Sequence, residues 1–280
     1  MTRPSAYLHY NAGAFVSGGG ACLVDPGITP DEIAGLAAEV GGARLCFVVL
    51  THADWDHVLG PEHLPATPIV AHSSYAAGLD RDGIRAALAG LEAHAGITRE
   101  TAFEPPLPDV TFDDETTLEL GELELLLTHG PGHSRSMLTV YEAASATLWA
   151  ADVLSDVELP SVIDDLESYE RTLERIASLQ LRHLVPGHGT PTEDRGDIRR
   201  RLDEDRGYLA ALRETVAASV AAGRSLEETV AAAAAISLRR ADGDDELHRL
   251  NAEKAYADLG GDADPLEVGY ARAWKALTGR

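Results

Sequence analysis

Four acidic and imidazole side chains crowd into one short stretch of the sequence. His52, Asp54, Asp56 and His57 lie within His-Ala-Asp-Trp-Asp-His. Two carboxylates and two imidazoles this close would repel one another and lose their hydration if buried, unless a cation holds them together. Imidazole nitrogen and carboxylate oxygen are ligands of zinc, iron and manganese. The stretch therefore predicts a metal site.

Three later segments offer further ligands of the same kinds. His133 follows Gly-Pro-Gly, Asp152 follows an apolar run, and His188 follows Pro-Gly. A single loop histidine is more often solvated, and a single aspartate often caps a turn, so each residue is a weak signal alone. His129 is a nearby substitute for His133, and the Pro-Gly context favours His133.

Each of these segments follows a predicted strand. The unbroken apolar run Leu45–Leu50 predicts a central strand, buried on both faces, directly before His52. Strands are likewise predicted before the other three segments, at Leu123–Thr128, Thr147–Ala150 and His183–Val185. Ligand sites of open α/β sheets lie beyond the carboxyl ends of strands. The four segments can therefore meet at one edge.

The rest of the first 195 residues predicts a mixed α/β chain. Further strands are predicted at Tyr7–His9, Ala14–Val16, Ala21–Val24, Pro68–His72, Thr117–Leu120 and Leu138–Tyr141. Helices are predicted at Pro30–Val40, Arg81–Ala95 and Ser168–Leu179. A strand, helix, strand order implies parallel crossovers.

Strand signals vanish after Arg195, where the composition becomes rich in Ala, Leu, Glu and Arg. Asp197–Ala222 predicts one long helix, and Ser225 with Glu228 forms a capping box that begins a second. Two more helices are predicted at Asp244–Leu259 and Pro265–Leu277. We expect a catalytic domain over 1–195 and a helical extension over 196–280, serving as a lid over the site or as a homodimer interface.

Charge and cysteine content restrict the partners and the compartment. With 46 acidic and 23 basic side chains the formal net charge is −23, which disfavours nucleic-acid and membrane-surface partners. Only Cys22 and Cys46 occur, both in apolar runs, which suits free thiols in a reducing compartment. No apolar run approaches the ~20 residues of a membrane span, and the first residues lack a signal-peptide pattern. These features predict a soluble cytoplasmic protein.

The motifs in this order resemble the metallo-β-lactamase superfamily. Its hallmark is H-x-H-x-D-H, followed by a separate His, an Asp that bridges two metals, and a last His; Asp25-Pro26-Gly27 also resembles its early Asp-x-Gly turn. The resemblance covers roughly residues 5–195. It implies a four-layer αββα sandwich formed from two similar halves, roughly 1–115 and 116–195, with a dinuclear metal site at the edge that they share.

The resemblance also implies a role for each candidate ligand. One ion would be held by His52, Asp54 and His133. The second would be held by Asp56, His57 and His188, with Asp152 bridging both. The implied reaction is hydrolysis by a hydroxide that bridges two divalent metals. Asp56 would be the catalytic residue that orients the hydroxide and then protonates the leaving group.

Asp54 departs from the family pattern, because the hallmark has its second histidine there. Zinc is the expected metal. An added anionic oxygen lowers Lewis acidity and suits iron or manganese slightly better, so both remain alternatives.

We expect cleavage of a small ester-like molecule: a thioester, a lactone or another carboxylic ester. The alternatives are a phosphoester hydrolase, a di-iron protein that handles oxygen or nitric oxide, and a non-catalytic binding module. Arg135 could hold an anionic group of the substrate or pair with a surface acid.

Overall fold

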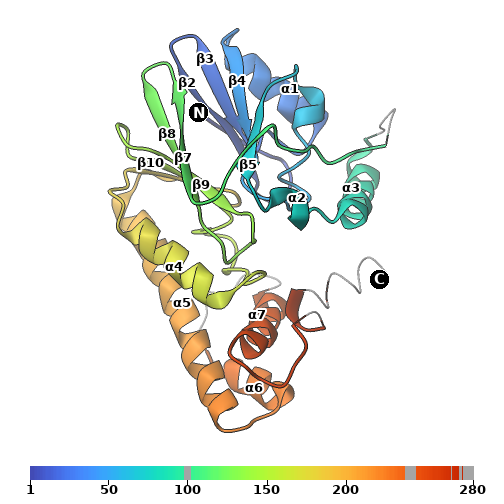
Figure 1. The fold of residues 1–280 in the computed structure, drawn as a ribbon, viewed down its shortest axis with the longest axis vertical. Helices are drawn as coiled ribbons and strands as arrows, with labels where there is room; N and C mark the ends of the chain where they lie inside the picture. The colour runs from blue at the N-terminus through green and yellow to red at the C-terminus, as the bar shows by residue number, and fades with distance from the viewer. Residues whose placement is uncertain (98–101, 237–243, 266, 271–272, 274–280) are drawn as a thin grey trace.

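Two β-sheets form the centre of the molecule, in a computed structural model that describes residues 1–97, 102–236, 244–265, 267–270 and 273 (Figure 1). The first sheet has six strands in sequence order, β1 (Thr2–Pro4), β2 (Asn11–Ser17), β3 (Gly20–Val24), β4 (Arg44–Val49), β5 (Ile69–His72) and β6 (Val110–Phe112). Strands β1 to β3 pair antiparallel, and β3 to β6 pair parallel.

The second sheet has five strands in the order β11-β10-β9-β8-β7. They are β7 (Glu115–Leu120), β8 (Leu123–His129), β9 (Leu138–Glu142), β10 (Thr147–Ala151) and β11 (His183–Pro186). Strands β7 to β10 pair antiparallel, whereas β11 lies parallel to β10. Because β10 and β11 are parallel, the loops that follow these two strands lie at the same edge of the sheet.

Apolar side chains between the sheets form a shared core. It includes Val24, Val49 and Val70 of the first sheet, and Leu127 and Trp149 of the second. In β8, Leu125 and Leu127 are buried while the alternate residues are less buried, which is the period-two pattern of a strand with one inward face. Burial of this alternating set fixes which face of each sheet meets the other.

Helices cover the two outer faces. Helix α1 (Pro30–Glu39) packs on the first sheet, and α3 (Arg81–Ala95) lies to one side and adds Ile84 and Leu88 to the same apolar cluster. Helices α4 (Leu166–Ala177) and α5 (Arg195–Ala221) pack on the second sheet. Helix α1 begins at a capping box in which Thr29 accepts from Glu32, and it buries Ile33 and Leu36. A 3₁₀ turn η1 (Pro61–His63) and the short α2 (Tyr75–Gly78) complete the first half. These layers confirm the predicted αββα sandwich.

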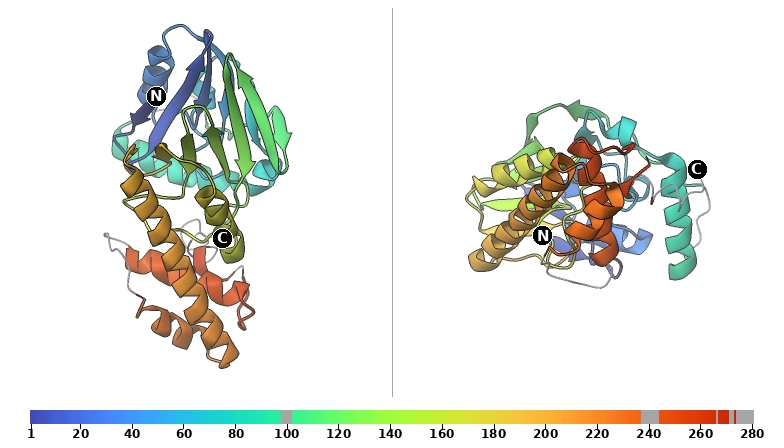
Figure 2. Two further views of the ribbon diagram at one scale, coloured as in Figure 1. Left: turned by 90° about the vertical axis from the view of Figure 1, so that its left-hand side faces the viewer. Right: turned by 90° about the horizontal axis from the view of Figure 1, so that it is seen from below.

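The C-terminal helices lie against one end of the sandwich. Helix α5 runs beyond the second sheet, and α6 (Leu226–Ala233) and α7 (Asp244–Asp258) pack beside its far half (Figures 1 and 2). One apolar cluster continues from Leu184 of the sheet through Tyr169 to Leu212 and Ala255. The helical extension therefore shares its core with the second half of the sandwich. Of the helices in the described ranges, none is long and apolar enough to cross a bilayer.

Some predicted elements differ from the structure. The strand predicted at Tyr7–His9 is wrong, because Leu8 and His9 have φ of 58° and 52° and form a turn. The first strand lies upstream at Thr2–Pro4, and β6 was not predicted, since both strands are too short to carry an apolar pattern. Helix α4 begins two residues before the predicted Ser168, because Asp165 caps it. Most of the helix predicted at Pro265–Leu277 lies outside the described residues.

Candidate metal centre

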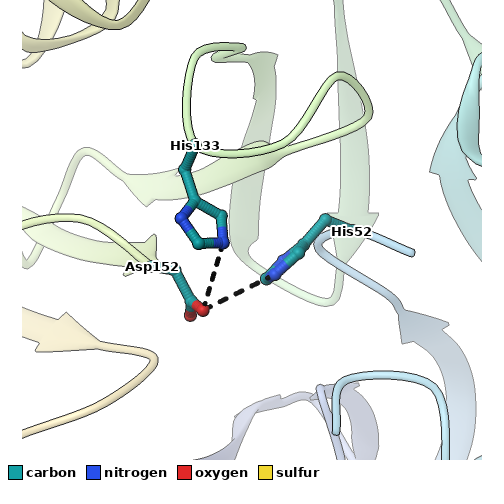
Figure 3. A group of neighbouring side chains, drawn as sticks. All are labelled: His52, His133 and Asp152. Atoms are coloured by element: carbon teal, nitrogen blue, oxygen red, sulfur yellow. Dashed lines mark ion pairs between the residues drawn. The ribbon is translucent and has the colours of Figure 1, made fainter. Parts of the chain in front are cut away.

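Four loops at one edge of the sandwich bring all seven predicted ligands together. The cluster from His52 to His57 follows β4, His133 lies between β8 and β9, Asp152 directly follows β10, and His188 follows β11. The side chains of His52, His133 and Asp152 point toward one another from three different loops (Figure 3). The placement beyond strand ends agrees with the expectation from the sequence.

The first group surrounds one Asp152 oxygen. Asp152 Oδ2 lies 3.6 Å from His52 Nε2 and 3.5 Å from His133 Nε2. Asp54 Oδ2 lies 3.6 Å from His52 Nε2 and 3.4 Å from His133 Nε2. The Asp54 side chain is 35% exposed, and His52 is fully buried. Asp54 therefore occupies the solvent side of this group.

The second group adjoins the first through the same aspartate. His57 Nε2 lies 3.2 Å from Asp152 Oδ1, and His188 Nε2 lies 3.4 Å from Asp152 Oδ2. Asp56 Oδ2 lies 3.2 Å from His188 Nε2 and 3.8 Å from His57 Nε2. Asp152 thus faces both groups, with one carboxylate oxygen toward His57 and the other toward the three remaining imidazoles.

These spacings fit two ions. Ligand atoms about 2 Å from a tetrahedral ion lie roughly 3.3 Å from one another, close to the distances in both groups. The Nε2 atoms of His52, His57 and His133, and Asp152 Oδ1, are buried with no hydrogen-bond partner among the described residues. Buried polar atoms are normally paired, so such a cluster of unpaired acceptors calls for a cation. The residues present therefore fit the implied divalent metals.

The electrostatics of the cluster point the same way. Burial lowers the pKa of His52 and the charge of His57 lowers it further, but Asp54 and Asp152 outweigh both and raise it to about 9. Burial raises the pKa of Asp152, yet the imidazoles of His57, His188 and His52 bring it well below its usual range. The carboxylates thus remain negatively charged, and the cluster as a whole attracts positive charge. In ligand clusters of this kind, bound metal ions supply that positive charge.

Asp25 and Thr51 contact the Nδ1 atoms of two of the histidines, on the side of each ring away from the cluster. Asp25 Oδ2 lies 3.0 Å from His57 Nδ1 and accepts from Thr51 Oγ1 at 2.6 Å, and its Oδ1 accepts from Thr51 N at 2.8 Å. Thr51 Oγ1 also lies 2.9 Å from His52 Nδ1. Fixing Nδ1 on the far side directs each Nε2 into the cluster. The sequence indicated the Asp25 turn but not this contact.

Backbone contacts fix the loop that carries His188. Its Nδ1 donates to Leu8 O at 2.8 Å. The buried Asn11 of β2 donates through Nδ2 to Pro186 O at 3.0 Å and to Gly189 O at 2.8 Å, and Asn11 N donates to Gly187 O at 2.7 Å. Asn11 was not predicted as a site residue, since a single asparagine in an apolar strand carries no ligand signal.

The start of the Asp152 loop is held in an uncommon backbone conformation. Ala151 and Leu154 have φ of 53° and 61°, which costs of order 1–3 kcal/mol for residues that are not glycine. Ala151 accepts from Gly187 N at 2.6 Å, and Asp152 O accepts from Tyr169 Oη at 3.3 Å. The contacts to the loop after β11 and to helix α4 support a conformation that aims Asp152 at the histidines.

The other residues noted in the sequence lie around the cluster. Arg135 is 79% exposed, with Nε 3.9 Å from Asp164 Oδ1. His129 stacks on His72, with ring centroids 3.6 Å apart, and its Nε2 donates to Arg135 O at 2.9 Å. The metal groups contain His133 and not His129. Trp55 packs against the core of the first half.

Comparisons with known proteins agree with this geometry. A model of the Metallo-beta-lactamase superfamily matches residues 8–188. The chain is 27% identical over 193 residues to a Gallus gallus protein named acyl-coenzyme A thioesterase MBLAC2, covering 59% of this chain and 67% of that protein. A Homo sapiens protein of the same name is 26% identical over 171 residues, covering 54% of this chain and 59% of that protein. The chain thus spans about three-fifths to two-thirds of these relatives.

Solved structures share the fold. The sec-alkylsulfatase Pisa1 from Pseudomonas sp. aligns with a TM-score of 0.66 at 16% identity, covering 91% of this chain and 48% of that one. TTHA1623, solved in a di-iron-bound form, aligns with a TM-score of 0.52 at 26% identity, covering 69% of this chain and 94% of that one. The first likeness extends over most of the chain and concerns fold alone.

Proposed function

The chain belongs to the metallo-beta-lactamase superfamily, and from this membership we propose that it is a metal-dependent hydrolase of a small ester-like substrate, with a thioester as the leading class. The observation that carries the proposal is the arrangement of buried imidazole nitrogens around Asp152. Their spacing of 3.2 to 3.6 Å from the carboxylate oxygens suits two cations that share this residue.

We assign the seven residues to two ions. His52, Asp54 and His133 would hold one ion, Asp56, His57 and His188 the other, and Asp152 both. When bound, two divalent ions lower the pKa of a water between them to about 7 and stabilise negative charge that develops on a substrate oxygen. We propose zinc as the metal, with iron or manganese as the alternatives that Asp54 favours.

The chain's own residues would complete the reaction. Asp56 is nearly buried and directs Oδ2 toward His188. Its second oxygen can accept a hydrogen from the attacking water and later return the proton to the leaving group. With that proton the leaving group departs as a neutral thiol or alcohol. Arg135 is exposed beside His133, where it can meet an anionic part of the substrate, or it can remain paired with Asp164.

Thioesters lead the substrate classes because of the relatives. Several proteins named acyl-coenzyme A thioesterases align with 54 to 59% of this chain at 26 to 27% identity. Lactones and other carboxylic esters need the same attack on a carbonyl carbon, and phosphoesters need attack on phosphorus at the same pair of ions. The alignment favours the carbonyl substrates.

A di-iron redox protein is the second candidate, and Asp54 is the observation that favours it. A carboxylate in place of the second histidine suits harder ions than zinc. The aligned TTHA1623 structure is in a di-iron-bound form. Such a protein would be isolated with iron and would change its absorption with oxygen or nitric oxide.

A substrate panel tests the proposed function. Wild type and Asp152→Ala are assayed on thioesters, lactones and phosphodiesters, after metal analysis of protein purified without added metal. We expect hydrolysis of a carbonyl substrate that falls by at least about 10²-fold in Asp152→Ala. Glu174→Ala, which removes an exposed carboxylate on α4, serves as the control and should keep full activity. Equal turnover by Asp152→Ala would disprove the mechanism, and iron without hydrolysis would favour the redox candidate.

A further inference from the structure

The loop from Val153 to Asp165, between β10 and α4, forms one wall of the candidate metal centre. A small cavity beside the cluster is lined on one side by His133, Asp152 and His188. On the other side it is lined by loop residues that include Glu158, Leu159, Pro160 and Ser161. The cavity holds only about 10 Å³, so the loop lies close against the ligands and would border a substrate bound at them.

Side chains of the C-terminal helices form hydrogen bonds with the backbone at three positions along this loop: near its start, in its middle and just past its end. Asp205 of α5 accepts from Leu154 N at 3.2 Å, near the start of the loop. Asp258 of α7 accepts from Leu166 N at 3.2 Å, just past its end. The middle of the loop is held by Asn251 of α7, which contacts Pro160 and Val162.

Asn251 uses its whole hydrogen-bonding capacity. Its Nδ2 donates to Pro160 O at 2.7 Å and to Tyr208 Oη at 2.8 Å. Its Oδ1 accepts from Val162 N at 2.8 Å and from Tyr270 Oη at 3.2 Å. The residue is fully buried. An amide has two donor hydrogens and two acceptor lone pairs, so every one is satisfied in a single orientation.

The contact continues across the C-terminal helices. Tyr208 Oη lies 3.0 Å from His248 Nδ1, and His248 Nε2 lies 2.9 Å from Ala233 O at the end of α6. The carbonyl of Ala233 can only accept, so His248 donates to it through Nε2, and its Nδ1 pairs with the Tyr208 hydroxyl. One buried chain of hydrogen bonds therefore joins α6, α7 and α5 to the loop. Such chains favour one packing, because breaking any link leaves a buried polar group unpaired.

We propose that Asn251 is a positioning residue that fixes the pocket wall Leu159–Ser161, so that the helical extension is a built-in part of the substrate pocket. The proposal rests on the proposed function for the meaning of the pocket. It differs from a moving lid, since a lid needs weak contacts that break in each cycle, whereas Asn251 is buried and fully bonded. Asn251 touches the loop backbone and not the metal ligands, so its effect concerns substrate binding more than the reaction step.

Two variants of Asn251, compared with a control variant, distinguish an effect on the position of the loop from a general loss of folding stability. Asn251→Leu removes all four hydrogen bonds at similar volume. Asn251→Asp keeps the shape and the acceptor but presents a carboxylate oxygen to Pro160 O, and it serves if the leucine variant does not fold. Thr229→Val is the matched control: Thr229 is also fully buried in the extension, but its hydroxyl donates only to Ser225 O within its own helix.

Amide hydrogen exchange of metal-loaded full-length protein is the first measurement. We expect exchange in 153–165 to rise by about tenfold or more in an Asn251 variant relative to the Thr229→Val control, with metal content unchanged. Exchange equal to that of the control would overturn the proposal. Faster exchange accompanied by a loss of bound metal would also overturn it, because the variant would then have disturbed the metal ligands as well as the loop. This readout needs no substrate, so it stands even if the hydrolase assignment fails.

Steady-state kinetics on the best substrate of the panel is the second measurement. We expect the Asn251 variants to raise KM by roughly tenfold while kcat stays within about threefold, because the wall contacts substrate and the ligands are undisturbed. Thr229→Val should change neither. A fall in kcat with unchanged KM would contradict a role in forming the pocket wall.

Discussion

Asp54 is the candidate ligand that stands where the sequence motif leads us to expect a histidine. Its carboxylate oxygen Oδ2 lies 3.6 Å from His52 Nε2 and 3.4 Å from His133 Nε2. An anionic oxygen there reduces the net positive charge at the ion and widens the choice of metal. The remaining ligands keep the residue types of the hallmark, so any change in metal preference is expected at this one group.

Replacing Asp54 tests that expectation. Asp54→His should raise the ratio of zinc to iron and manganese retained after purification without added metal, because three imidazoles form a softer site. Metal content measured by mass spectrometry on equal amounts of wild type and variant checks this ratio. Asp54→Asn, which removes the charge without adding a nitrogen ligand, is the control and should lower total metal instead. An unchanged ratio in Asp54→His would contradict a role for Asp54 as ligand.

Turns after strands are the elements on which the site depends. The loop after β11 approaches the loop after β10 so closely that Gly187 leaves no room for a side chain: a Cβ there would collide with Asp152 Oδ1. Gly132, just before His133, has φ of 129°, a conformation reserved for glycine, and a Cβ there would meet Tyr169. The Pro-Gly pairs that marked two ligand segments in the sequence thus reflect close packing around the ligands.

Gly187→Ala should therefore damage the site more than the fold. The added methyl displaces Asp152, and we expect metal affinity to fall by about 10-fold or more, as for loss of an orienting contact around a metal. Isothermal titration of the metal-free protein measures it. Gly207→Ala is the matched control, since Gly207 lies within α5 with nothing within 4 Å of its Cβ position. That substitution should leave metal affinity intact and stabilise the helix by about 1 kcal/mol.

At the scale of the whole molecule, the candidate site joins parts that are distant along the chain. Its ligands come from both halves of the sandwich, and the loop beside Asp152 is held by the C-terminal helices. Bound ions would then link the first sheet, the second sheet and the extension. Without bound ions, charged carboxylates and imidazoles lie buried at this junction. The free energy needed to remove these groups from water then opposes folding.

Metal removal should consequently destabilise the entire fold. Ions that bind only the folded state add about 4 kcal/mol when their free concentration is roughly a thousand times Kd. We expect a chelator to lower the Tm measured by calorimetry and added metal to restore it. Asp152→Ala, which loses the residue shared by both ions, should show little of this shift. A Tm indifferent to chelation in wild type would mean that the cluster holds no ion that matters for folding.

The αββα layers were predicted from the strand and helix patterns together with the resemblance of the motifs to the metallo-β-lactamase superfamily, and the same motifs supplied the candidate ligands. Apolar runs of strand length, such as the one before His52, mark buried strands, and polar residues directly after them stand out against that pattern. The predicted strand at Tyr7–His9 failed because positive φ at two residues depends on contacts with distant loops: His188 Nδ1 donates to Leu8 O, and Gly189 N to His9 O.

The supporting contacts could not be predicted, because they join residues far apart in the chain. Asn11 bonds to Pro186 and Gly189 across 175 and 178 positions, and Asn251 bonds to Val162 across 89. No periodicity or motif in the sequence marks an asparagine that will be buried. Most of its partners are backbone atoms, which every residue has, so the sequence does not identify them either. Ligand types follow from the chemistry of single side chains, which the sequence records. Whether those side chains are aimed at one point depends on how sheets and helices pack, and only the tertiary structure decides that.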